Sequence, residues 1–143
     1  MTEKNMTNGI IANATGLCFG DYNATEKIKV NDFEHMGSTY SLRTHNQVTR
    51  LEKNGELLLE TVPGARVLDF CFSEKGCSFE IESNANVQVT LGMLPEAAYD
   101  LAIAECNIKG AETHEEIEAN RSGKISFGVE LVGAAKKVVL ERL

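Results

Sequence analysis

The chain has 143 residues, of which 43% are hydrophobic and 24% charged, and these values are typical of one globular domain. Its formal net charge of −7 makes nucleic acids and anionic membranes poor partners, because both are negatively charged. The sequence contains no apolar run near the ~20 residues of a membrane-spanning helix, and its first residues lack the pattern of a signal peptide. We therefore expect a cytoplasmic protein or a domain excised from a longer secreted one.

The first 25 residues are rich in Asn, Thr and Gly. They predict a polar N-terminal arm over 1–25, ahead of a domain over 26–143. Residues 10–12 and 16–19 are apolar enough to form an edge strand within this arm. The chain contains the formal N-glycosylation sequence at Asn5, Asn13, Asn23 and Asn120, which has meaning only in a eukaryotic secretory route.

A polar cluster follows over residues 40–46. On a strand, Arg43 and His45 would share one face and Leu42 and Thr44 the other. An Arg and a His on one face can hold a carboxylate or hydroxyl groups. We take four residues as candidate ligand-binding residues: Tyr40, Arg43, His45 and Arg50. The alternative interpretation is a strand face that simply faces solvent.

Residues 48–62 carry the strongest local signal, Asn54-Gly55 between two strand-like runs. Asn-Gly is typical of the type I′ turn of a hairpin, in which both central residues need a positive φ. This hairpin predicts that Lys53 faces Glu56 and that Leu51 faces Leu58.

Residues 67–72 and 77–82 predict a second hairpin, with Gly76 in a left-handed position next to a bulge. That register pairs Phe72 with Ser78 and Cys71 with Phe79. It places Cys71 and Cys77 diagonally on one face, so no disulfide is expected between them. We expect all four cysteines, Cys18, Cys71, Cys77 and Cys106, to be buried thiols.

Residues 87–91 alternate as a strand, but residues 95–105 are ambiguous. Pro95, Glu96 and several Ala residues favour a short helix, whereas Tyr99, Leu101 and Ile103 alternate with smaller or polar residues as in a strand. We favour the strand, because the neighbouring segments are strands.

Seven acidic residues against one Lys109 lie between Glu96 and Glu118. Such runs are usually a solvated face or loop, and a cation site is the sharper alternative. Further alternating runs cover 124–131 and 137–143. Short strands at this spacing predict an all-β fold, a single-domain antiparallel β-sandwich of the immunoglobulin, fibronectin or jelly-roll kind.

Catalysis has no recognisable signature here. The sequence lacks a nucleophile elbow, a zinc-protease motif, a phosphate-binding loop and a dinucleotide fingerprint. We expect no cofactor and no metal, and we consider an enzyme the less favoured possibility. The absence of Trp also argues against an aromatic platform for sugars.

The last third of the chain, from about Val87 to Leu143, resembles the C-terminal β-sandwich module of bacterial polysaccharide-active enzymes, including heparinase II/III-type lyases. The resemblance rests on 99–103, on 122–131 with its Ser-Gly-x-hydrophobic start, and on 137–140. This chain departs from the pattern in its long acidic insert after Ile103. The resemblance implies a non-catalytic accessory role and identifies no functional residues.

Three hypotheses for function remain open. The first is a non-catalytic accessory or binding module of a bacterial carbohydrate-active system, with a polysaccharide or a neighbouring catalytic domain as its partner. The second is a self-associating structural protein, and hence a homo-oligomer. The third is a small enzyme with a site around Arg43 and His45.

Overall fold

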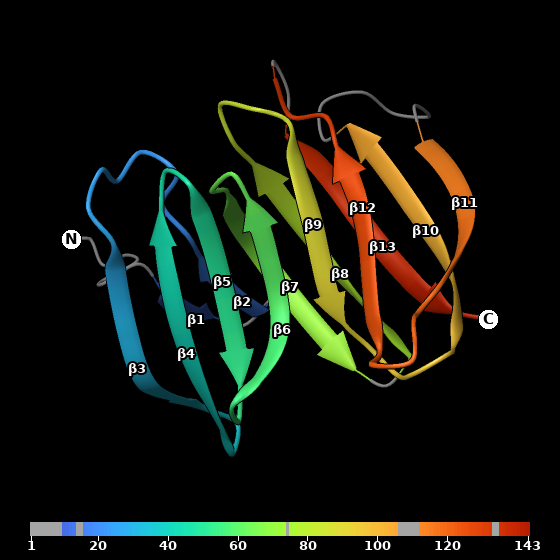
Figure 1. Ribbon diagram of the computed structural model, residues 1–143, viewed down its shortest axis with the longest axis horizontal. Coiled ribbons are helices and arrows are strands. Elements are labelled where there is room, and N and C mark those ends of the chain that lie inside the picture. The colour runs from blue at the N-terminus through green and yellow to red at the C-terminus, as the bar shows by residue number, and fades with distance from the viewer. Residues whose placement is uncertain (1–9, 14–15, 74, 106–111, 133–134) are drawn as a thin grey trace.

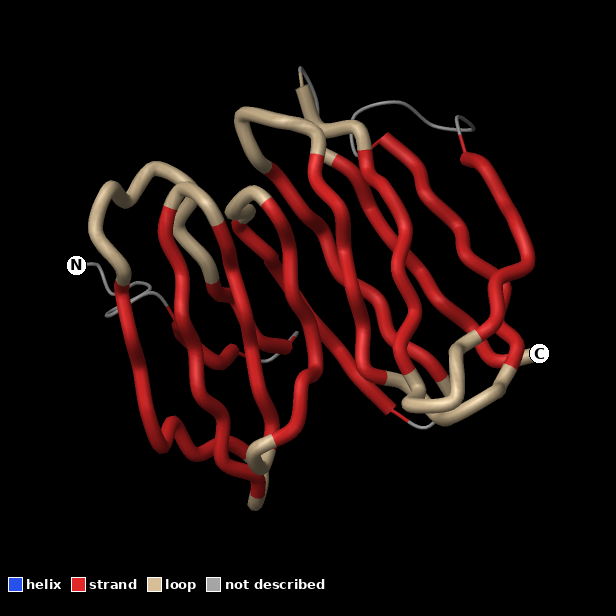
Figure 2. Tube along the Cα trace, viewed as in Figure 1, coloured by secondary structure: helices blue, strands red, loops and turns tan. Residues whose placement is uncertain are grey.

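The computed structural model describes residues 10–13, 16–73, 75–105, 112–132 and 135–143. Two antiparallel sheets pack face to face, and the elements described are strands joined by turns and loops (Figures 1 and 2). The predicted all-β, single-domain sandwich is confirmed. Within the described ranges, no helix is long and apolar enough to cross a membrane.

Sheet A has seven strands, and in spatial order these are β1 (Ile10–Asn13), β2 (Gly16–Phe19), β7 (Arg66–Ser73), β8 (Gly76–Glu82), β13 (Lys136–Arg142), β10 (Ala98–Glu105) and β11 (Glu112–Glu118). Sheet B has six, namely β12 (Lys124–Val129), β9 (Val87–Gly92), β6 (Glu56–Val62), β5 (Val48–Lys53), β4 (Ser38–His45) and β3 (Ile28–His35). In Figure 1, β1 and β3 lie toward one end of the sandwich, and β11 and β12 lie toward the other.

The connectivity is nested. Strand β10 pairs with β11 in sheet A, β9 with β12 in sheet B, and β8 with β13 in sheet A. A long hairpin thus wraps around the sandwich and alternates between its sheets, as in a jelly roll. The strands β3 to β6 form a simple meander that extends sheet B. Of the sandwich types considered from the sequence, the jelly roll therefore describes this topology.

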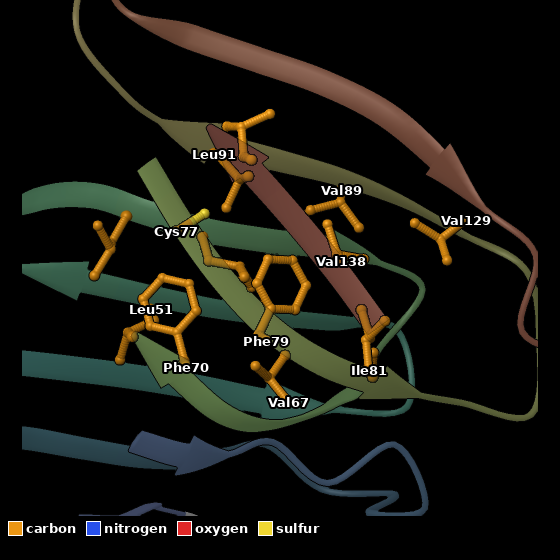
Figure 3. Packing of buried hydrophobic residues seen from close by; sticks show 14 of the residues in the cluster. Leu51, Val67, Phe70, Cys77, Phe79, Ile81, Val89, Leu91, Val129 and Val138 are labelled. Atoms are coloured by element: carbon orange, nitrogen blue, oxygen red, sulfur yellow. The ribbon is translucent and has the colours of Figure 1, made fainter. Parts of the chain in front are cut away.

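The core lies between the two sheets and is built from Val, Leu, Ile and Phe side chains of alternating strand positions. Figure 3 shows Phe70 and Phe79 of sheet A beside Leu51 of sheet B. The rings of Phe70 and Phe79 lie 5.6 Å apart. The core also includes Leu17 and Phe19 of β2, which belong to the segment predicted to be a polar arm.

The β5–β6 hairpin confirms the predicted turn, since Asn54 has φ 51° and Gly55 has φ 86°. Lys53 pairs with Glu56 as predicted, but Leu51 pairs with Leu59 rather than Leu58. The pairing shifts by one residue between Leu51 and Glu52. The prediction was wrong here because an extra residue on β6 forms a bulge, which a continuous run of leucines does not reveal.

The β7–β8 hairpin also differs from its predicted register. Phe72 pairs with Cys77 and Cys71 with Ser78, one residue away from the expected pairs. Cys71 and Cys77 therefore point to opposite faces, Cys71 exposed and Cys77 buried, and no disulfide joins them. The expectation of a buried thiol is wrong for Cys71, and Cys106 lies outside the described residues.

The ambiguous segment is a strand, and the alternative of a short helix near 95–105 is wrong. Tyr99 and Leu101 are buried, and β10 is paired on both sides, with β11 and β13. Pro95 and Glu96 form a turn in which the Ala97 amide donates to the Leu94 carbonyl and Glu96 has φ 57°. Pro95 thus opens a turn rather than a helix. Part of the acidic run forms the edge strand β11, and its residues 106–111 lie outside the described ranges.

Candidate functional site

A row of directly paired residues crosses the outer face of sheet B. It begins with three basic residues, Lys29, Arg43 and Arg50, and continues through Glu60, Thr90 and Ser126. Directly opposed residues of an antiparallel pair lie on the same face, with Cβ atoms about 4.5–5.5 Å apart. The register therefore brings three cationic side chains together on neighbouring strands.

Only one of these three cations is neutralised by described carboxylates. The Arg50 Nε donates to Glu52 and its Nη1 to Glu60, both at 2.9 Å. The hydrogen bonds to Glu52 and Glu60 raise the pKa of Arg50 above its usual value. Arg43 and Lys29 are exposed, and neither forms an ion pair with a described residue. Their charges are available to a ligand.

A bulge in β3 shapes the surface beside Arg43. The β3–β4 register shifts between Val30 and Phe33, and Asp32 has φ 59°, a conformation that Asp tolerates better than most residues. A small cavity of about 80 Å³ opens here, and its polar lining consists of Asn31, Ser41, Arg43, Arg50 and Glu52. Bulges are common beside binding sites because they redirect side chains.

The two outer faces of the sandwich carry opposite charge. At paired positions on sheet B the outward-facing charged residues are Lys29, Arg43, Arg50 and Lys124 against Glu34, Glu52 and Glu60. On sheet A they are Arg66 and Lys137 against Glu80, Glu82, Asp100, Glu116, Glu118 and Glu141. The excess acid of the chain is thus concentrated on sheet A, away from the row of basic residues.

The four site residues predicted from the sequence do not all lie in one site. Arg43 and Arg50 are direct partners on the outer face, and His45 shares that face two residues along β4. The His45 Nδ1 lies 3.4 Å from the Asn46 Oδ1. Tyr40 points the other way: it is only 8% exposed, and burial raises the pKa of its hydroxyl. Tyr40 therefore belongs to a different site.

That second site is a groove between the sheets, which no pattern in the sequence predicted. A cavity of about 400 Å³ is lined by the first residues of β2, the β3–β4 turn, and the last residues of β5 and β7. Its aromatic and basic lining includes Tyr40, Phe70, Phe72, His35 and Lys53. A cavity of about 220 Å³ adjoins it and shares Lys53 and Phe72. We call the two together the inter-sheet groove.

The described part of the chain also contains reactive and metal-binding types of side chain outside these two sites. Within it, no group of three or more His, Cys, Asp or Glu side chains is placed to hold a metal ion. The Nδ1 of His114 lies 3.0 Å from Asp100 on an exposed face. Burial raises the pKa of Cys77 to about 12, so this thiol stays protonated and is a poor nucleophile at neutral pH.

Lys29 and the groove residues were missed for local reasons. Lys29 lies between Ile28 and Val30, and this alternation is the signal that could have identified an outward-facing residue of a strand. The β3–β4 turn contains Met36-Gly37, with φ 50° and 82°. A Met at a position with positive φ lacks the Asn-Gly signature by which such turns are recognised.

Comparisons of this chain with protein-family models, with curated proteins and with solved structures give no match.

Proposed function

We propose that the chain is a non-catalytic binding module of a bacterial carbohydrate-active system, and that it binds a carboxylate-bearing polysaccharide on the outer face of sheet B. The observation that carries the proposal is the row of Lys29, Arg43 and Arg50, in which two of three opposed cations lack a described ion-pair partner. Arg is well suited to this role because its guanidinium donates two parallel hydrogen bonds to a carboxylate.

The distribution of charge supports a local anion site despite the net charge of −7. Charges that lie more than about 8 Å apart are largely screened at physiological salt. The field near Arg43 is therefore set by its neighbours on sheet B, where paired outward-facing bases outnumber acids. A flat strand face with a shallow polar cavity also suits an extended polymer better than a small substrate that must be enclosed.

The proposal is tested by calorimetric titration with a short oligomer of galacturonic acid. The matched control ligand is its methyl ester, which keeps the sugar and removes the charge. We expect the acid to bind and the ester to bind at least about tenfold more weakly, because a hydrogen bond to a charged group contributes about 1.5–3 kcal/mol.

Two variants locate the site. Arg43→Gln should weaken binding of the acid by about tenfold or more, whereas Lys137→Gln, on the outer face of sheet A, should leave it unchanged. Equal binding of acid and ester, or equal loss in both variants, would overturn the proposed site.

Self-association is a second candidate, and a separate observation favours it. Glu141, Asp100 and Glu116 are directly paired across sheet A, so a row of three acids on one face matches the three bases on the other. Contact between unlike faces of successive copies would form an open stack rather than a closed dimer. Light scattering at low salt tests this candidate. A native mass that rises with protein concentration, and that is lower for Arg43→Gln than for the wild type, supports self-association. A monomer mass that is constant across concentrations excludes it.

A further inference from the structure

The inter-sheet groove combines an apolar floor with two basic side chains. Tyr40, Phe70 and Phe72 contribute aromatic surface to its larger cavity, and the ring of Phe72 is partly exposed. Phe70 and Phe72 are stacked, with ring centroids 6.4 Å apart. The volume of about 400 Å³ is in the range of small-molecule sites, which are mostly apolar with a few placed polar groups.

Among the described residues that line it, the larger cavity contains basic side chains and no acidic ones. Its lining contains Lys53 and His35 but no Asp or Glu, in a chain with 21 acidic and 14 basic residues. The adjoining cavity contains one carboxylate, Glu56. The charge complementarity therefore favours an anionic group in the larger cavity, beside its aromatic side chains.

Lys53 occupies an unusual position for a lysine. It pairs with Tyr40 across β4 and β5, so its side chain is on the inner face of sheet B. Its Nζ lies 5.6 Å from the centre of the Phe72 ring. A lysine that faces inward and rests on an aromatic ring is held over the groove, where its charge is less screened than at an open surface.

Tyr40 adds a second polar group beside Lys53. The residue is only 8% exposed, and no hydrogen bond joins its hydroxyl to a described residue. The hydroxyl oxygen itself retains accessible surface, since Thr61 Oγ1 is the one fully buried and unpartnered side-chain atom among the described residues. A tyrosine hydroxyl in an apolar site usually finds a partner, and this one is open to a ligand in the groove. Burial also raises the pKa of this hydroxyl, which keeps it a hydrogen-bond donor. A carboxylate that accepts from both Lys53 and Tyr40 would satisfy both groups.

The rim of the groove exposes apolar side chains. Met36 is 90% exposed at a strained φ of 50°, and Leu94 is 37% exposed beside the smaller cavity. With Phe72 they account for three of the six exposed large hydrophobic residues among those described. Exposed apolar surface at the rim of a cavity is typical of a ligand site.

From these observations we propose that the inter-sheet groove binds a small amphipathic carboxylate, with its carboxylate at Lys53 and Tyr40 and its alkyl or aromatic body against Phe70, Phe72 and Met36. This site is on the inner side of sheet B and is independent of the polysaccharide site on the outer face. The inference therefore stands or falls separately from the proposed function.

The test uses octanoate, with 1-octanol as the uncharged control of equal length. Anilinonaphthalene sulfonate, itself an apolar anion, reports occupancy by its fluorescence. We expect the dye to bind the wild-type protein and octanoate to displace it at least about tenfold more effectively than octanol does. No binding of dye or octanoate at millimolar concentration, or equal displacement by octanoate and octanol, would overturn the proposal.

Three variants connect the result to the groove. Lys53→Gln should weaken octanoate by about tenfold and leave octanol unchanged, and Lys53→Arg should retain octanoate because it retains the charge. Lys124→Gln, an outward-facing lysine on β12, is the matched control and should change neither. Circular dichroism of each variant checks folding, and unchanged octanoate affinity in folded Lys53→Gln would contradict the proposed role of Lys53.

Discussion

Arg43 and Arg50 lie directly opposite each other on β4 and β5, with both side chains on the outer face of sheet B. Glu52 and Glu60 neutralise Arg50, and no described carboxylate does the same for Arg43. Like charges that face each other across an antiparallel pair are destabilising. Lys29 faces Arg43 from β3 and has no ion pair with a described residue. The folded protein therefore retains a repulsion between Lys29 and Arg43 that a bound carboxylate would relieve.

Replacing Arg43 should consequently stabilise the isolated protein. We expect Arg43→Gln to raise the free energy of unfolding in urea by about 0.2–1 kcal/mol at low salt. The gain should shrink at about 1 M salt, where the Debye length is about 3 Å. Arg50→Gln is the control: it removes two ion pairs whose side chains are 29–35% exposed and should lower stability, by less than about 1 kcal/mol. A loss of stability in Arg43→Gln would contradict the repulsion.

Three threonines form a buried row on the inner face of sheet B, and two of them share a hydrogen-bond network. Thr49 donates to the Ala65 carbonyl at 2.9 Å and accepts from the Ala65 amide at 3.1 Å. Its one proton is thus used, so the 2.8 Å contact with Thr44 has Thr44 as the donor. Thr61 is equally buried, but its hydroxyl has no hydrogen-bond partner among the described residues.

This difference predicts opposite outcomes for the same substitution. Thr49→Val leaves the Ala65 amide without an acceptor and the Thr44 proton without one, although the Thr44 oxygen still accepts from the Asp21 amide, and it should cost about 1–3 kcal/mol of unfolding free energy. Thr61→Val removes an unsatisfied hydroxyl at nearly constant volume and should be neutral or stabilising. Urea unfolding of both variants measures the contrast, and similar losses in the two would show that the network does not contribute as described.

The type I′ turn of the β5–β6 hairpin can be tested with two glycines. Gly55 has φ 86° and open space around it, so Gly55→Val should lose more than about 1 kcal/mol through backbone strain alone. Gly128 lies on edge strand β12, where an added Cβ would make an ordinary 3.6 Å contact, so Gly128→Val should be neutral or stabilising. Chemical denaturation measures the free energy of unfolding of both variants. A loss of less than about 0.5 kcal/mol in Gly55→Val would exclude the type I′ turn.

The buried thiol of Cys77 predicts a change of stability at alkaline pH. Its pKa is raised to about 12 in the folded protein from 9.0, so only the unfolded chain releases this proton between these values. The contribution of Cys77 is complete below about pH 9 and is lost at about 1.4 kcal/mol per pH unit as the pH rises toward 12.

The measurement compares wild type with Cys77→Ala under reducing conditions. Ala has no titrating group, so the free energy of unfolding of wild type should fall more steeply than that of the variant above about pH 9. Parallel pH profiles for the two proteins would mean that Cys77 titrates normally in the folded state.

Alternation of apolar and polar residues was enough to predict the sandwich, because each strand buries one face. It also placed Arg43 and His45 on the same outward face. Registers were predicted less well, since the runs around Leu58 and Phe72 satisfy two pairings equally and the bulges that decide between them depend on neighbouring strands.

Local sequence patterns could not predict the row of basic residues or the inter-sheet groove. Lys29 and Arg43 are far enough apart in sequence that only the β3–β4 register brings them together. Lys53 and Phe72 belong to different sheets, so their contact depends on how the two layers pack. A turn centred on Met36 rather than on Asn concealed the hairpin that connects β3 with β4.

Mapping the contact by NMR shows whether the outer face of sheet B binds a carboxylate-bearing glycan. The backbone-amide spectrum would be followed during titration with the galacturonic acid oligomer. We expect saturable shifts centred on Lys29, Arg43 and Arg50, which are absent with the methyl ester. Shifts that centre on sheet A, or a spectrum unchanged at millimolar ligand, would contradict this expectation.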